Sequence, residues 1–118
     1  MAKLALLSFP LQHSAYRYIA TEIDMIHVRR AAEHDSPAFE VIVREGKGET
    51  RHHVTMSREM CERLTAGKHT PERYLEAAFR FLLDREPKES ILRRFDVTAI
   101  SRYFPEFERE MPQYLSQL

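Results

Sequence analysis

The sequence predicts an α+β domain, a three-stranded antiparallel β-meander followed by three or four helices that cover one face of it. Between residues 23 and 56, β-branched and aromatic residues alternate with polar ones in three runs separated by turn residues. From residue 57 onward the apolar residues recur at helical spacing, and capping residues mark where helices begin and end. A length of 118 residues, 43% of them hydrophobic, suits a single core. We therefore expect one domain, at residues 21–110.

The two ends of the chain are predicted to lie outside that domain. Residues 1–20 show neither alternation nor a helical period, and Pro10 interrupts their apolar run. They form a poor signal peptide, because the positive region is thin and no small-residue cleavage site follows. We expect an N-terminal arm at residues 1–20 and a C-terminal tail at residues 111–118. The opposing hypothesis is that residues 4–7 form an edge strand or pack across a second copy of the chain, and the second of these predicts a homodimer.

Three strands are expected in order, with turn chemistry between them. The first covers residues 23–30, the second residues 38–44, and the third residues 49–56. Residues 33–37 include Asp, Ser and Pro, and residues 46–48 read Gly-Lys-Gly, so both segments favour chain reversals. The apolar face of this meander must be covered by helices, since a three-stranded sheet alone would leave that face exposed to water. The residues of this face are Phe39, Val41, Val43, Val54 and Met56.

Two helices follow, and the second is predicted to be the central one. Ser57 is a good N-cap for a short helix that ends at Gly67. Thr70 is the N-cap of the next helix, with Pro71 at the first helical position, and the helical period continues to about Asp84. Its apolar arc is so wide that it needs a sheet on one flank and another helix on the other.

The remaining chain is expected to be helical in shorter pieces. Pro87 interrupts the pattern, after which one or two helical turns are predicted through Ile91, Leu92 and Phe95. Asp96 is expected to cap a further helix that stops at Pro105. The residues after it are weakly amphipathic.

Two phrases in this half resemble a known group of proteins. Residues 81–95 read FLLDREPKESILRRF and residues 103–108 read YFPEFE. Together with the preceding hairpin they resemble a group of short bacterial proteins with no assigned activity, over roughly residues 22–108. The resemblance implies a soluble bacterial cytoplasmic protein and supplies no functional residue. The single cysteine, Cys61, also fits a reducing compartment, because it has no partner for an internal disulfide.

Composition and motifs argue against catalysis, cofactors, metals and membranes. Three glycines provide no phosphate-binding loop, and neither a nucleophile elbow nor H-E-x-x-H occurs, so we expect no enzyme and no cofactor. His52 and His53 are adjacent on a predicted strand, so they leave opposite faces and cannot chelate one ion. Cys61 is expected to be a small buried hydrophobe. No run approaches 18 apolar residues, as a membrane span would require.

The leading functional hypothesis is a noncatalytic binding or regulatory module that acts through a protein partner. Tyr103, Phe104, Phe107 and Tyr114 form an aromatic run in a polar, acidic setting, the kind of composition that partner surfaces favour. A small meander followed by a helix also resembles in outline the antitoxins of the HicB kind. The structural alternative is that these aromatic residues close the core.

The second hypothesis is a DNA-binding regulator that uses a degenerate helix-turn-helix at residues 91–104. Eighteen basic and eighteen acidic residues give no overall basic field, so DNA binding would need a local patch. The structural alternative pairs Arg93 and Arg94 with Glu86, Glu89 and Asp96 on an exposed surface. Across the two hypotheses, the candidate binding residues are Arg93, Arg94, Ser101, Arg102, Tyr103 and Phe107.

Overall fold

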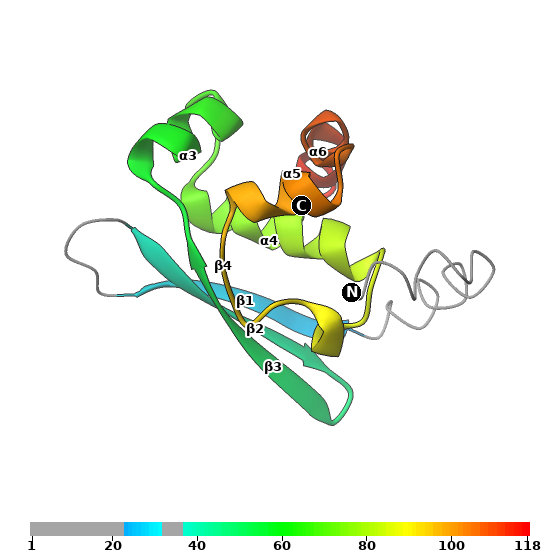
Figure 1. The fold of residues 1–118 in the computed structure, drawn as a ribbon. Helices are drawn as coiled ribbons and strands as arrows, with labels where there is room; N and C mark the ends of the chain where they lie inside the picture. Colours follow the sequence, from blue (N-terminus) through cyan, green and yellow to red (C-terminus); the bar gives the residue numbers. More distant parts are fainter. Residues whose placement is uncertain (1–22, 32–36) are drawn as a thin grey trace.

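The α+β class is confirmed by the structure, a computed structural model that describes residues 23–31 and 37–118. The described helices lie on one side of the sheet (Figure 1). In chain order the elements are β1 (Ile23–Ala31), β2 (Ala38–Glu45), β3 (Gly48–Thr55), α3 (Arg58–Thr65), α4 (Pro71–Leu83), the 3-10 helix η1 (Lys88–Ser90), β4 (Arg94–Asp96), α5 (Thr98–Tyr103) and α6 (Phe107–Ser116). The predicted arm at residues 1–20 lies outside the described residues. None of the described helices is long and apolar enough to cross a membrane.

The meander of β1, β2 and β3 forms with the predicted antiparallel pairing. Val28 lies opposite Val41, and Ile42 lies opposite Arg51. The turn between β2 and β3 uses Gly46 at a φ of 59°, a left-handed conformation that glycine adopts without steric cost. The alternating residues of β2 therefore divide into a buried face toward the helices and a polar outer face.

A fourth strand makes the sheet mixed, which the sequence did not predict. β4 pairs in parallel with the edge of β3, so the helical turns expected over residues 91–95 are wrong. The open edge of β3 supplies backbone partners. The His53 N–H donates to the Arg93 carbonyl at 2.7 Å, and the Val97 N–H donates to the Thr55 carbonyl at 2.9 Å. Backbone hydrogen bonds to the unpaired edge of a sheet stabilise a short segment more than one isolated helical turn does, because a single turn is costly to nucleate.

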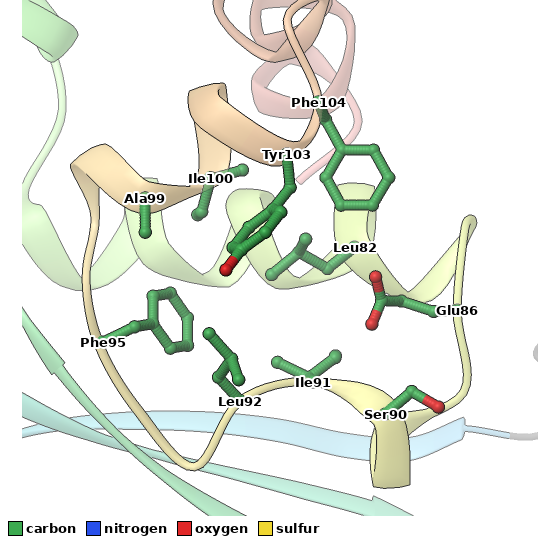
Figure 2. Close-up of a pocket in the computed structure, with 10 residues that line it drawn as sticks. All are labelled: Leu82, Glu86, Ser90, Ile91, Leu92, Phe95, Ala99, Ile100, Tyr103 and Phe104. Atoms are coloured by element: carbon green, nitrogen blue, oxygen red, sulfur yellow. The ribbon is translucent and has the colours of Figure 1, made fainter. Parts of the chain in front are cut away.

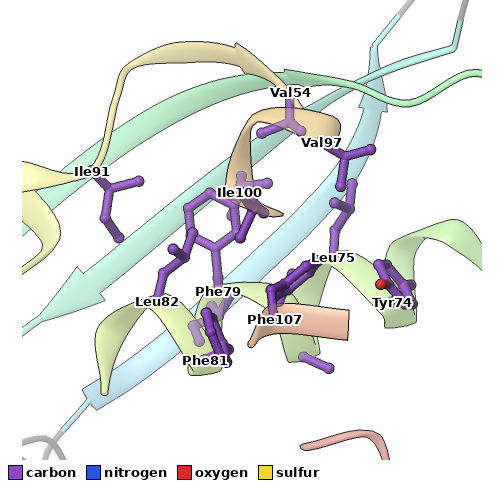
Figure 3. Close-up of a cluster of buried hydrophobic side chains, with 14 of the residues drawn as sticks. Val54, Tyr74, Leu75, Phe79, Phe81, Leu82, Ile91, Val97, Ile100 and Phe107 are labelled. Carbon is purple, nitrogen blue, oxygen red and sulfur yellow. The ribbon is translucent and has the colours of Figure 1, made fainter. Parts of the chain in front are cut away.

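The core is built around α4, as predicted. The hydroxyl of Thr70 accepts a hydrogen bond from the Arg73 N–H at 3.1 Å, which fixes where the helix begins. α4 lies between the sheet and the pair α5 and α6 (Figure 1). Side chains on both flanks are therefore buried: Tyr74, Leu75, Ala77, Ala78, Phe79, Phe81, Leu82 and Leu83. Figure 3 shows Phe79 and Leu82 of α4 meeting Ile100 of α5.

The end of α4 is joined to α6 by Arg85. Its guanidinium donates to Glu110 at 2.7 Å and to Glu106 at 3.1 Å, and it stacks 3.7 Å from the centre of the Phe81 ring. α6 buries Phe107 and continues to Ser116, so the predicted boundary of a tail at residue 111 falls inside this helix. The C-terminal residues are thus part of the cover over α4.

Candidate binding site

The site with the clearest chemistry is a largely apolar pocket beside the C-terminal end of α4. It lies between α4, the chain that leads from η1 into β4, and α5 (Figure 2). Its volume is about 170 Å³. We call it the apolar pocket, and it is lined by Leu82, Glu86, Ser90, Ile91, Leu92, Phe95, Ala99, Ile100, Tyr103 and Phe104.

Local chain direction explains why this pocket is hollow. After α4 the chain leaves the helix and returns along the β3 edge, because β4 must pair there. The detour holds Ile91 and Leu92 away from Leu82 and leaves space between them (Figure 2). Leu92 and Tyr103, 44% and 37% exposed, are the exposed large hydrophobic side chains of the part that the structure describes. Both line this pocket, so apolar surface is concentrated around its opening.

One ionisable side chain points into the apolar pocket. Glu86 is only 6% exposed, and Figure 2 shows its carboxyl group directed into the space beside Leu82. No hydrogen bond or salt bridge joins that carboxyl group to another described residue, but the positive charge of the N-terminal amino group acts on it and opposes the effect of burial on its pKa. Burial raises the pKa of Glu86 to about 7, because the apolar surroundings disfavour the charged form. An apolar pocket with a single convergent polar group is typical of a ligand-binding site.

A second hollow of about 590 Å³ lies on the outer face of the sheet. Five arginines and His53 surround it, against a single carboxylate, so its electrostatic potential is positive. We call it the arginine hollow, and it is lined by Arg29, Arg30, Ala31, Glu40, Arg51, His53, Arg93 and Arg94.

Three of these arginines have acidic neighbours. Arg29 and Arg51 both pair with Glu40, and the hydrogen bond from Arg29 lowers the pKa of that carboxyl group. Arg30 lies 3.8 Å from a carboxylate oxygen of Glu72. Within the part of the chain that the structure describes, Arg93 and Arg94 form no salt bridge. These two cations are therefore the ones most available to an anion.

The acidic partners expected for Arg93 and Arg94 are engaged elsewhere, so the predicted ion-paired surface is wrong. Glu86 points into the apolar pocket. Glu89 accepts from Lys88 at 2.9 Å. Asp96 accepts hydrogen bonds from the Thr55 hydroxyl at 2.6 Å and from the N–H and hydroxyl of Thr98. Glu86 and Glu89 precede β4 in the chain, and Asp96, which does lie in β4, has its carboxylate held by Thr55 and Thr98.

The six candidate binding residues are divided among different places. Arg93 and Arg94 line the arginine hollow, and Tyr103 lines the apolar pocket. Ser101 is oriented toward Glu108, with 3.5 Å between the hydroxyl and a carboxylate oxygen, while Arg102 is exposed. Phe107 is 1% exposed in the core. The helix-turn-helix is not formed, because the first of its two expected helices is the β4 segment.

Sequence reasoning missed most of the apolar pocket, including Leu82, Glu86 and Ala99. The sequence pattern places Glu86 on an exposed surface with Arg93 and Arg94, not in a pocket. No signal in the sequence separates Glu86 from the many other carboxylates, because its burial depends on the path of the chain from η1 to β4. The only local sign is its place between the end of α4 and Pro87.

His52 and His53 lie on opposite faces of β3, as the strand period predicts. His52 is 1% exposed on the helix side, whereas His53 lines the arginine hollow on the other. The His52 ring nitrogens contact the Leu92 carbonyl at 2.8 Å and the Thr50 hydroxyl at 2.9 Å, and burial lowers its pKa. Among the described residues no cluster of three or more His, Cys, Asp or Glu could hold a metal ion.

Comparisons with protein-family models, curated proteins and solved structures found no match to this chain. The resemblances to short bacterial proteins and to HicB-type antitoxins therefore stay predictions.

Proposed function

We propose that the chain is a noncatalytic binding module that acts through a protein partner, one side chain of which enters the apolar pocket. The observation that carries this proposal is the position of the two exposed large hydrophobic residues, Leu92 and Tyr103, at one opening. A bacterial cytoplasmic setting belongs to the same proposal, since it rests on the sequence resemblance and on the single thiol.

The size and composition of the pocket suit one anchoring side chain. Its volume of about 170 Å³ slightly exceeds that of an engineered apolar cavity of about 150 Å³ that binds benzene. Burying a fully exposed leucine contributes about 1.5–3 kcal/mol, so covering the 44% of Leu92 that is exposed contributes about 1 kcal/mol. Tyrosine is enriched among the residues that dominate interface energetics. A partner that filled the pocket and covered Leu92 and Tyr103 would thus gain stabilisation from a small contact.

A peptide selection tests this proposal. A displayed library of random 12-residue peptides is selected on the full chain, and the recovered peptides are measured by calorimetry against Leu92→Ala and Ala99→Phe, which respectively trim and fill the pocket. The matched control is Gln113→Ala, an exposed position on α6 outside the pocket. We expect affinity to fall at least about tenfold in both pocket variants and to stay unchanged in the control. Failure to recover any peptide, or peptides that bind all variants equally, would refute the proposal.

DNA binding stays the second candidate, now through the arginine hollow. The observation that favours it is the pair Arg93 and Arg94, which have no salt bridge among the described residues and lie beside three further arginines. Phosphate contacts make affinity fall steeply with salt, by a log–log slope of about 0.9 per neutralised phosphate. Electrophoretic mobility with mixed genomic fragments at 50 and 200 mM salt is the test. Binding that weakens with salt and is lost in Arg93→Ala/Arg94→Ala supports this candidate, and the absence of any shift at 50 mM salt rejects it.

A further inference from the structure

We propose that the arginine hollow binds the phosphate group of a small, hydroxyl-rich phosphate monoester of the sugar phosphate class. The hollow lies on the outer face of the sheet, away from the helices and the apolar pocket, so this inference is independent of the proposed protein partner. It also differs from the DNA-binding candidate, because it assigns the hollow to one terminal phosphate and not to a nucleic-acid backbone.

A row of paired residues crosses the whole sheet at this hollow. Arg29 of β1 lies opposite Glu40 of β2, and Glu40 lies opposite His53 of β3. His53 in turn lies opposite Arg94 of β4. All four residues line the hollow, since side chains directly opposite one another share a face. The row ends in an arginine on each side, about 14 Å apart at a strand spacing of about 4.8 Å, so a ligand over the middle strands has a cation on either side.

Glu40 fixes two of the arginines without using all of their donors. The Arg29 Nε donates to Glu40 at 2.7 Å, and the Arg51 Nη1 donates to the other oxygen of Glu40 at 3.4 Å. Arg51 also donates from its Nε to Glu49 at 3.2 Å. A guanidinium has five N–H donors, so both groups keep donors for a ligand. Holding these side chains in place beforehand lowers the entropy cost of binding.

Arg93 and Arg94 provide the charge that remains for a ligand. Both side chains are exposed, and within the described part of the chain neither forms a hydrogen bond or a salt bridge. A phosphate monoester carries nearly two negative charges at pH 8, because its second proton dissociates with a pKa of about 6. The planar fork of arginine binds two phosphate oxygens at once. Two free arginines therefore match one monoester group in charge and in geometry.

Arg30 belongs to the lining but is held elsewhere. Its guanidinium lies 5.2 Å from the centre of the Phe39 ring and 3.8 Å from a carboxylate oxygen of Glu72. We therefore expect Arg30 to contribute to the positive potential of the hollow and not to contact the phosphate directly.

The size and lining of the hollow indicate what carries the phosphate. Its volume of about 590 Å³ lies within the range of about 300–1,000 Å³ that is typical of small-molecule sites, and it exceeds the needs of a free phosphate ion. Among the described residues that line it there is no Phe, Tyr or Trp, so it offers a base no stacking platform of the kind that single-stranded nucleic-acid sites use. Arginine and histidine donors suit the hydroxyl groups of a sugar.

A long phosphate backbone fits the hollow less well than one terminal phosphate. Strongly salt-dependent DNA binding reflects about 6–10 phosphate contacts, whereas the hollow has two arginines without an ion pair among the described residues. Glu40 lies within the row and would repel a continuous line of phosphates. The formal net charge of the chain is zero, so there is no long-range field that would attract a polyanion.

Four probes test the assignment: ribose 5-phosphate, ribose, inorganic phosphate, and a DNA duplex of about 12 base pairs without terminal phosphates. Each is titrated at pH 8 and constant ionic strength into the isotopically labelled full chain. Affinity is measured from the backbone amide signals of Arg51 and His53, which line the hollow and are unchanged in every variant.

The variant is Arg93→Gln/Arg94→Gln, which removes two charges from exposed side chains and leaves the backbone pairing of β4 in place. The matched control is Arg58→Gln/Arg73→Gln, which removes the same charge from exposed positions on α3 and α4 outside the hollow.

We expect ribose 5-phosphate to bind at least about tenfold more tightly than ribose and than inorganic phosphate. Its affinity should fall at least about tenfold in Arg93→Gln/Arg94→Gln and change less than about twofold in the control.

Each other outcome overturns the inference. If ribose binds as tightly as ribose 5-phosphate, the phosphate is not recognised, and if inorganic phosphate does, the sugar is not. Tighter binding of the duplex, lost in Arg93→Gln/Arg94→Gln, assigns the hollow to DNA. Equal losses in the variant and the control show a general effect of charge. If no probe binds, the hollow is not a phosphate site, and the peptide selection on the apolar pocket is unaffected.

Discussion

Replacing Glu86 by glutamine should stabilise this protein at alkaline pH and leave its stability nearly unchanged at acidic pH. Glutamine preserves the size and hydrogen-bonding capacity of the side chain but cannot ionise. The 6% exposure of Glu86 and its mostly apolar neighbours make ionisation in the folded state unfavourable.

The magnitude follows from the pKa. Burial raises it from the ordinary value of 4.5 to about 7. At about 1.4 kcal/mol per pH unit, this shift corresponds to a penalty of about 3 kcal/mol once the carboxyl group is ionised in both states. Below pH 4.5 the group is protonated whether folded or unfolded, so it contributes no difference. Between pH 4.5 and 7 the unfolded chain loses its proton first, and the wild type loses stability as pH rises.

Urea melts of wild type and Glu86→Gln at pH 4, 6 and 8 provide the measurement. The advantage of the variant should grow from near zero at pH 4 toward about 3 kcal/mol at pH 8. The other titrating groups cancel in the difference because both proteins carry them. If the difference in free energy of unfolding between Glu86→Gln and wild type is the same at all three pH values, Glu86 is not buried in an apolar setting and the reasoning is refuted.

Three further predictions concern the core, a buried histidine and the arm. Phe79→Ala should cost about 3–5 kcal/mol in a urea melt, because the ring is fully buried and lies 5.2 Å from the ring of His52; a loss below about 1 kcal/mol would contradict the central role of α4. The pKa of His52 is lowered below 6.5, so its stabilising contribution is complete above pH 6.5 and is lost as pH falls toward the folded value. His52→Gln should therefore lose less stability than His53→Gln when the pH of the melt is lowered from 7 to 5, and equal losses would contradict a buried neutral His52. Removal of residues 1–20 should lower the Tm by less than about 5 °C at high and low protein concentration, and a larger fall confined to high concentration would instead identify the arm as a dimer contact.

The sequence by itself determined the parts of this fold that depend on local periodicity. The alternation of apolar and polar residues predicts the positions of β1, β2 and β3, because successive side chains on a strand point to opposite faces. Ser57 and Thr70 marked where α3 and α4 begin, since a hydroxyl beside unpaired N–H groups is favourable in any tertiary setting. The width of the apolar arc on α4 also determined that the helix is covered on two flanks.

Only the tertiary structure decided the segment after α4, and with it the candidate site. Ile91, Leu92 and Phe95 fit a helical turn as well as a strand, and the unpaired edge of β3, distant in sequence, favours the strand. That choice moves Arg93 and Arg94 to the outer face and opens the apolar pocket. It also buries Glu86, because the chain returning toward β4 excludes water from a carboxyl group that local sequence places in a loop. Burial and long-range pairing depend on residues far apart in the chain, so no local pattern could have located this site.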